Sequence, residues 1–221
     1  MSIIQLNNVS FRYRGDSEWT LKSVTLEINE GKYLVVGPTG SGKTTLLRII
    51  AGLIPKVYQG ELSGEIKVSG KAVLVPQLFD LFILMPTVRE ELAYCYEIGN
   101  TERGKIGSEM LYLTKKLGIE HLLDREISKL SMGERQKVAI ASALAIGAEI
   151  IMLDEPLAYL DPAAVHEFLS FLNTISAKVI IMAEHRTKYL EGWYHKLIFL
   201  KNGTVFPVRT ISEAEEILEN F

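Results

Sequence analysis

The sequence predicts an α/β fold with a mostly parallel sheet, an antiparallel β edge and a helical insertion. Short apolar runs alternate along the chain with longer amphipathic segments, which is typical of strands and helices around a parallel sheet. Residues 150–153 are apolar without alternation, which indicates a strand that is covered on both faces. Strand-like runs are missing between Gln77 and Leu130, so we expect that stretch to be mostly helical.

Each expected element has its own signal in the chain. Residues 3–13 and 21–28 alternate between apolar and polar side chains, which predicts antiparallel strands at one edge. The expected strands of the parallel sheet are 33–36, 72–75, 149–153, 178–183 and 197–200. The expected helices follow Gly42 and span about 88–96, 108–117, 131–146 and 162–175. We therefore expect one domain over residues 1–221, with a core from about 1–76 and 148–221 and a helical subdomain over about 77–147.

The composition is that of an ordinary globular chain. Of the 221 residues 48% are apolar, and 24 basic against 27 acidic residues give a net charge of −3, which does not support a nucleic-acid-binding face. Cys95 is the only cysteine, so an internal disulfide is excluded and a reducing compartment is expected. No run approaches the roughly 18 apolar residues of a membrane-spanning helix, and the first residues lack the basic start of a signal peptide. We expect a soluble, cytosolic protein.

A glycine-rich loop between an expected strand and an expected helix fits the pattern G-x-x-x-x-G-K-[ST]. Its residues are Gly37, Pro38, Thr39, Gly40, Ser41, Gly42, Lys43 and Thr44. The glycines let several backbone N–H groups face one anion, and the helix that follows points its positive end at the same place. We expect Lys43 to reach the β- and γ-phosphates of a nucleoside triphosphate, Thr44 to bind Mg²⁺ and Thr45 to add a phosphate contact. The alternative is a Gly/Ser turn that caps the helix.

Two acids, Asp154 and Glu155, follow the apolar run at 150–153 in the pattern of a Walker B segment. Ligands of open α/β sheets bind beyond the carboxyl ends of the strands, so both acids should emerge near the glycine-rich loop. Asp154 can hold Mg²⁺ through a water molecule, and Glu155 can orient or deprotonate the water that attacks the γ-phosphate. In isolation the pattern also fits a strand that ends in solvated acids.

The segment Leu130-Ser131-Met132-Gly133-Glu134 resembles the L-S-G-G-Q/E signature of ATP-binding-cassette (ABC) ATPases. Ser131 and Glu134 fit an S-x-x-E capping box, which begins a helix with its N–H groups and dipole directed at an anion. An ordinary capped helix has the same pattern, but this one precedes the acidic strand by the distance that the family pattern expects.

Four more residues follow in family order. Tyr13 resembles the aromatic residue that stacks on adenine, although Phe11 lies only two residues away. Gln77 resembles the Q-loop glutamine that senses Mg²⁺ and the attacking water. Asp161 resembles the D-loop aspartate, which communicates between two sites, and His185 resembles the switch histidine, which contacts the γ-phosphate. The structural alternatives are an edge-strand tyrosine, a loop glutamine, a helix N-cap aspartate and a structural histidine.

The resemblance runs from Ile3 to about Gly203 and implies a P-loop NTPase core that uses ATP and Mg²⁺. The catalytic residues that it implies are Glu155, His185, Gln77 and Lys43, and the metal-binding residues are Thr44, Gln77 and Asp154. It also implies a second cassette, identical or paralogous, in a head-to-tail sandwich in which Ser131, Gly133 and Glu134 of one cassette close over ATP on the other. Integral membrane transporter subunits are the further partners, no nucleic acid is expected, and the chain would be peripheral on the cytoplasmic face of the cell membrane.

Met132 stands where the family usually has glycine. Glycine there allows the backbone to approach phosphate closely, and a long side chain can obstruct that approach. We hypothesise a weakened or slower closed site. The alternative is that the side chain of Met132 points aside.

The segment 78–86, which follows Gln77, is unusually apolar for a loop region. In transporter cassettes this region helps to form a groove for a coupling helix of the membrane partner, and an exposed apolar patch suits such docking. The alternative is that the segment belongs to the core of the subdomain. If it docks the partner, Phe82→Asp uncouples transport and spares ATP binding.

The finer resemblance is to cassettes of the energy-coupling-factor importers, which take up vitamins or cobalt and nickel ions. It is carried by residues 52–55, 60–65, 87–93, 139–142 and 184–186. A second glutamine shortly after the Q-loop is missing, and many members of that group continue into a C-terminal domain beyond the point where this chain ends. Another importer, an exporter, a soluble ABC ATPase acting on nucleic acid or ribosomes, and a P-loop phosphotransferase remain as alternatives.

Overall fold

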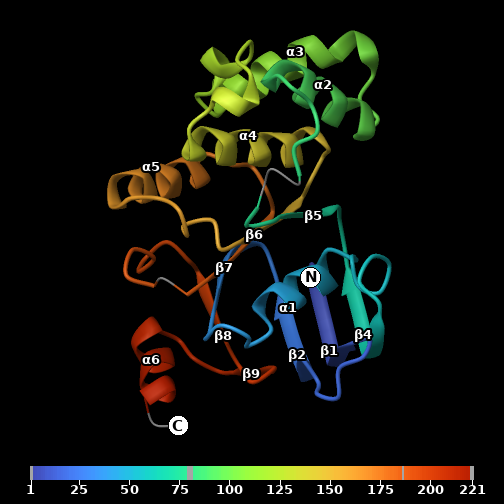
Figure 1. The fold of residues 1–221 in the computed structure, drawn as a ribbon, viewed down its shortest axis with the longest axis vertical. Coiled ribbons are helices and arrows are strands. Elements are labelled where there is room, and N and C mark those ends of the chain that lie inside the picture. Colours follow the sequence, from blue (N-terminus) through green and yellow to red (C-terminus); the bar gives the residue numbers. More distant parts are fainter. Residues whose placement is uncertain (1, 79–81, 186, 220–221) are drawn as a thin grey trace.

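Two β-sheets and the helices that cover them make up the computed structural model, which describes residues 2–78, 82–185 and 187–219 (Figure 1). The strands are β1 (Ile4–Tyr13), β2 (Leu21–Ile28), β3 (Gly31–Val36), β4 (Gly60–Val68), β5 (Ala72–Val75), β6 (Ile150–Asp154), β7 (Val179–Glu184), β8 (Lys196–Lys201) and β9 (Thr204–Phe206). The helices are α1 (Lys43–Ile50), α2 (Val88–Ile98), α3 (Arg103–Lys116), α4 (Met132–Ala145), α5 (Pro162–Leu172) and α6 (Ile211–Glu219). The predicted fold class is confirmed.

The larger sheet positions the candidate site. Its strand order is β5-β6-β7-β3-β8-β9, and all neighbours pair in parallel except β8 and β9. Because β6, β7 and β3 are adjacent and parallel, their carboxyl ends meet at one edge of the sheet. The glycine-rich loop follows β3, Asp154 ends β6 with Glu155 directly after it, and His185 follows β7.

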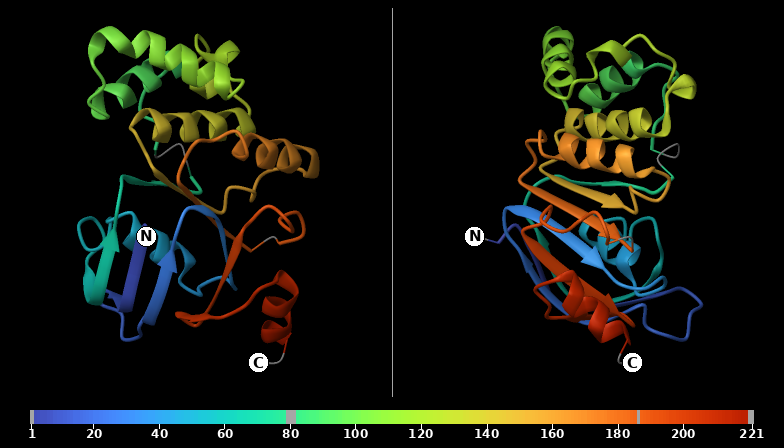
Figure 2. Two further views of the ribbon diagram at one scale, coloured as in Figure 1. Left: turned by 180° about the vertical axis from the view of Figure 1, so that it is seen from behind. Right: turned by 90° about the vertical axis from the view of Figure 1, so that its left-hand side faces the viewer.

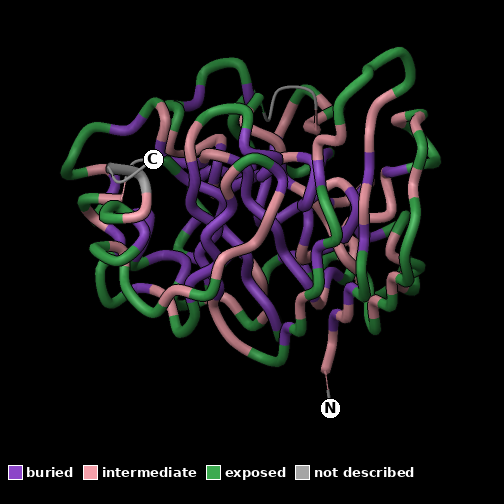
Figure 3. The backbone as a smooth tube through the Cα atoms, turned by 90° about the horizontal axis from the view of Figure 1, so that it is seen from below, coloured by how far each residue is buried: buried purple, intermediate pink, exposed green. Residues whose placement is uncertain are grey.

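Both faces of this sheet are buried, as the uniformly apolar strands predict. In β3, Leu34 and Val36 belong to the core that the sheet shares with α4 and α5. The alternating residues Tyr33 and Val35 belong to a second core, which includes α1 and the antiparallel sheet. The tube coloured by burial shows these strands as the purple centre of the molecule, with most loops exposed around it (Figure 3).

The antiparallel sheet has the strand order β2-β1-β4. Its first two strands were expected, whereas β4 was not. No residue of β4 is buried, so it lacks an apolar run that could identify it. Gly64 of β4 lies opposite an irregularity in the pairing with β1. Its φ is 93°, and a Cβ on Gly64 would lie 2.5 Å from the carbonyl oxygen of Asn8.

Helices α2, α3 and α4 lie together at one end of the molecule, beyond β5 and β6 (Figure 2). Within 77–147, the described residues contain no strand beyond a single β-bridge between Thr87 and Glu126, as expected for the insertion. Helix α3 begins at Arg103 rather than near residue 108, and neither β9 nor α6 was expected. None of the helices in the described ranges has the length and apolarity needed to cross a lipid bilayer.

Candidate functional site

The glycine-rich loop curls between β3 and α1. Gly37 has φ at 157°, and a Cβ on it would lie 1.9 Å from the carbonyl oxygen of Leu200. Gly42 caps α1 with φ at 104°, and a Cβ there would lie 2.8 Å from a methyl group of Leu21. A side chain at Gly37 would collide with β8 and one at Gly42 with β2, and both backbone conformations favour glycine. The loop therefore wraps closely around the N-terminus of α1, where the backbone N–H groups can face an anion.

Lys43 lies in this loop with only 5% of its surface exposed. Its Nζ donates to the carbonyl oxygens of Gly37, at 2.8 Å, and Pro38, at 3.2 Å. Burial lowers the pKa of Lys43, and the nearby carboxylates, of which Glu155 has the largest effect, oppose that shift. A buried ammonium that is held by carbonyl dipoles is well placed to accept an anion as its partner.

Two further features of the loop fit a bound triphosphate with its metal. The hydroxyl of Ser41 is buried and has no hydrogen-bond partner among the described residues, so it is an unpaired polar group inside the loop. The hydroxyl of Thr44 donates to Oδ1 of Asp154 at 3.0 Å. Burial raises the pKa of this carboxyl group, and the hydrogen bond from Thr44 partly offsets the shift. A hydroxyl and a buried carboxylate side by side are suitable oxygen ligands for Mg²⁺ beside phosphate oxygens.

Glu155 lies between two other predicted residues, Gln77 and His185. Its Oε2 accepts a hydrogen bond from Nε2 of Gln77 at 3.4 Å and lies 3.5 Å from Nδ1 of His185. Both distances are at the long end for a hydrogen bond, so the three side chains are adjacent but loosely paired. Glu155 also has φ at 49°, in the left-handed region, which costs about 1–2 kcal/mol for a residue with a Cβ. Such a conformation persists only where its surroundings fix it.

Tyr13 lies beside the first turn of α1. Its hydroxyl is 3.0 Å from the hydroxyl of Thr45 and accepts a hydrogen bond from Arg48 at 3.0 Å. Phe11 is fully buried, so of the two candidate aromatic residues only Tyr13 has surface left for a base. Thr45 is 4% exposed, and its hydroxyl already contacts Tyr13.

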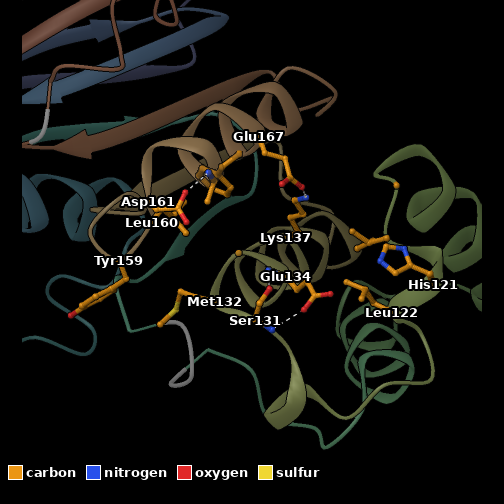
Figure 4. A pocket seen from close by; sticks show the side chains of 15 residues that line it. His121, Leu122, Ser131, Met132, Glu134, Lys137, Tyr159, Leu160, Asp161 and Glu167 are labelled. Carbon is orange, nitrogen blue, oxygen red and sulfur yellow. Dashed lines mark hydrogen bonds and ion pairs between the residues drawn. The ribbon is translucent and has the colours of Figure 1, made fainter.

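The signature residues lie apart from this group, in a cavity of about 660 Å³ (Figure 4). The predicted capping box is present: the N–H of Glu134 donates to Oγ of Ser131 at 3.3 Å, and the N–H of Ser131 donates to Oε2 of Glu134 at 2.7 Å. The hydrogen bond from the Ser131 N–H to the carboxylate is the main cause that lowers the pKa of Glu134. Asp161 lines the same cavity and caps α5 by accepting from the N–H of Ala164 at 2.9 Å.

Exposed side chains line the cavity. Met132 and Tyr159 line it with 39% and 57% of their surfaces exposed, and a Cβ added to Gly133 would meet nothing within 4 Å. Among the described residues that line it, none comes from the loop at 37–45. One chain therefore carries two separate parts, a phosphate loop with its carboxylates and a capped helix N-terminus with the Asp161 turn.

Comparison with known proteins decides the family. The family model described as ABC transporter matches residues 21–158. A protein of Pyrococcus abyssi with the provisional name ABC transporter ATP-binding protein is 31% identical, over 100% of this chain and 84% of its own length. This chain belongs to the ABC transporter ATP-binding cassettes.

Longer relatives carry the same provisional name. One from Enterococcus faecalis is 36% identical, covering 96% of this cassette and 40% of the relative, and one from Methanosarcina mazei is 35% identical, covering 100% and 41%. The cassette thus spans about two fifths of the first curated relatives that it matches. Among solved structures, CbiO1 from Clostridium perfringens matches with a TM-score of 0.83 and 23% identity, over 99% of this cassette and 91% of that chain. The P-loop cassette fold is therefore shown.

The segment predicted to dock a membrane partner is partly described, since residues 79–81 lie outside the described ranges. Leu78 and Leu84 are 58% and 65% exposed, whereas Phe82 and Ile83 pack against the larger core. The buried carboxylate of Glu91 holds the end of the segment by accepting from the N–H groups of Leu84 and Met85, both at 2.9 Å. The core interpretation therefore holds for Phe82 and Ile83, whereas docking of a membrane partner stays a prediction for the exposed leucines.

Two buried residues beside the site were missed. Glu184, at the end of β7, is fully buried, and its carboxylate accepts from the N–H groups of Leu157, at 2.7 Å, and His185, at 3.2 Å. Gln136 of α4 is 5% exposed and donates to the carbonyl oxygen of Pro156. A signal was available for both. An acid at the end of an apolar strand, and a glutamine on the apolar face of a helix, each require a buried partner.

Proposed function

We propose that this cassette binds and hydrolyses ATP as the motor subunit of an ABC transporter. The observation that carries the proposal is the position of Glu155. Its carboxylate contacts both Gln77 and His185, and it directly follows Asp154, which pairs with Thr44. Positioning and electrostatic stabilisation are most of what phosphoryl transfer requires.

Each residue has a definite task in this proposal. The loop N–H groups and Lys43 bind the phosphates, and Thr44 and Asp154 hold Mg²⁺. When bound, Mg²⁺ neutralises charge that develops on the phosphates. Glu155 orients the attacking water and accepts its proton, with Gln77 and His185 fixing the carboxylate and reaching the γ-phosphate side. Tyr13 offers its ring to the base.

The signature cavity supports a two-chain mechanism. Its capped helix N-terminus suits an anion, yet the phosphate loop of the same chain does not line it. We infer that Ser131, Gly133 and Glu134 close over ATP on a second cassette, identical or paralogous, in a head-to-tail sandwich. Asp161 and its turn lie at the same face. Closure of the two cassettes would move the membrane subunits, and ATP hydrolysis would let the cassettes separate again.

The transported cargo is the finer part of the proposal. The motif resemblance favours an importer of the energy-coupling-factor type for vitamins or metal ions, at the cytoplasmic face of the cell membrane. CbiO1 is described as part of the ABC transporter complex CbiONQ, and an assembly of similar kind is what we propose for this cassette. The 23% identity between CbiO1 and this cassette supports the fold only, so the proposal for the cargo rests on the motifs.

Glu155→Gln tests the hydrolytic role. The amide keeps the shape of the side chain but cannot accept the proton, so kcat for ATP should fall by at least about 10²-fold while ATP binding stays within about twofold. Glu65→Gln, the same change on the exposed surface of β4, is the matched control and should retain full activity. Normal turnover in Glu155→Gln would refute the assignment.

Isolation of partners from detergent-solubilised membranes tests the transport role. We expect the tagged chain to retain polytopic membrane proteins and a cassette. Retention of nucleic acid or ribosomes instead, with ATPase stimulation by them, would replace the transporter assignment with a soluble ABC ATPase.

A further inference from the structure

Gln136 joins the signature helix to the turn that carries Glu155. It lies in α4, two residues after Glu134 of the capping box, and its Nε2 donates to the carbonyl oxygen of Pro156. Pro156 directly follows Glu155 in the chain. The contact is buried, with Gln136 only 5% exposed. A helix that faces a second cassette thus touches the backbone beside the hydrolytic residue of its own chain.

The Glu155 turn depends on such contacts because its left-handed backbone is unfavourable. Two of them come from β7: the N–H of Glu155 donates to the carbonyl oxygen of Ala183 at 2.9 Å, and that of Leu157 donates to the Glu184 carboxylate at 2.7 Å. These partners belong to the central sheet and are fixed by it. A further contact comes from Gln136, which belongs to α4 and not to the sheet.

Stability alone does not account for a glutamine at this position. Its Oε1 is buried and has no hydrogen-bond partner among the described residues, which costs free energy. An apolar side chain of similar length would fill the space without that cost. Gln136 lines a small cavity of about 10 Å³ together with Gln77 and Asp154. The signature helix, the Q-loop and the end of β6 therefore meet at this cavity.

We propose that Gln136 is a positioning residue that transmits the position of the signature helix to Glu155. When Ser131 and Glu134 engage the nucleotide on a second cassette, α4 shifts as one body, and Gln136 carries this shift to the Pro156 carbonyl. Glu155 then takes its hydrolytic geometry only in the closed pair. The inference rests on the proposed function, because it assumes that Glu155 assists hydrolysis and that two cassettes pair.

Gln136→Met tests the proposal because it keeps the length of the side chain, removes the donor and also removes the unpaired oxygen. We expect kcat for ATP to fall by at least about tenfold, with KM and ATP affinity within about twofold of wild type. In the nucleotide-free protein, amide hydrogen exchange should become faster in the peptide that covers residues 155–158. An unchanged kcat together with unchanged exchange overturns the proposal.

Ile140→Val is the matched control. Ile140 lies one turn further along α4, is 1% exposed and lines the same small cavity, but its side chain makes no hydrogen bond. It should lose some thermal stability and keep both kcat and the exchange rate of residues 155–158. An equal fall of kcat in both variants would assign Gln136 a merely structural role. If wild type itself does not hydrolyse ATP, the proposed function fails, and the exchange measurement alone decides the role of Gln136.

Discussion

The hydroxyl of Thr44 donates a 3.0 Å hydrogen bond to Oδ1 of Asp154, which joins the first turn of α1 to the end of β6. Asp154 is only 8% exposed, and burial raises the pKa of its carboxyl group. A raised pKa in the folded state means that ionisation of Asp154 opposes folding. Its contribution to stability is fully present below the ordinary aspartate pKa and declines as the pH rises through the folded value.

Asp154→Asn should therefore stabilise the metal-free protein at pH 7. The amide oxygen can still accept from Thr44, but no buried charge remains. We expect a higher Tm than wild type at pH 7 and a difference that shrinks as the pH falls toward about 4, where wild-type Asp154 also becomes neutral. If Asp154 holds Mg²⁺ as we propose, ATP hydrolysis should also fall by at least about 10²-fold.

Asp16→Asn is the matched control for Asp154→Asn, because Asp16 is an exposed residue. It should change neither the pH dependence of Tm nor the hydrolysis rate. A lower Tm for Asp154→Asn at pH 7 would show that the ionised carboxylate stabilises the metal-free fold, contrary to the argument.

The fold was predictable wherever a segment carries a local signal. Strand β6 is buried on both faces, and its uniform apolarity identified it. The capping boxes at Thr87 and Ser131 fix where α2 and α4 begin. Strand β4 was missed because its residues are exposed or half-buried and it is held mainly by pairing with β1, which is distant in sequence. Pairing of this kind leaves no periodic pattern to recognise.

The sequence predicted the residues of the site that lie in loops and at strand ends, but not the buried residues that hold the Glu155 turn. The phosphate loop and Asp154 follow strands whose parallel order brings them together, so spacing and strand ends were sufficient. Gln136 and Glu184 act through hydrogen bonds to backbone groups of a turn. Such partners depend on how α4 and β7 pack, which no local pattern specifies. The catalytic and binding roles themselves stay predictions until the variants are measured.

Met132→Gly tests whether this side chain slows closure of the composite site. Met132 is 39% exposed at the first turn of α4, on the wall of the signature cavity. If it crowds the approaching phosphate at a cost of about 1 kcal/mol, its removal should raise kcat about fivefold. Thermal stability should fall slightly, by about 0.5–1 kcal/mol, because glycine is more flexible.

Met132→Leu is the companion variant, since it keeps the bulk and should leave kcat near the wild-type value. A rate for Met132→Gly that is equal to or below wild type would mean that the methionine points aside in the closed pair.

Leu84→Asp is a cleaner probe of the docking segment than Phe82→Asp. Phe82 packs against the core, so a charge there should lower stability as well as coupling, whereas Leu84 is 65% exposed and only its backbone is held, by Glu91. We expect Leu84→Asp to reduce co-purification of membrane subunits at least about tenfold, with ATP affinity and Tm unchanged. Val57→Asp is the matched control because Val57 is also 65% exposed but lies in the loop after α1. If both variants retain the membrane subunits equally well, the exposed leucine is not part of the docking surface.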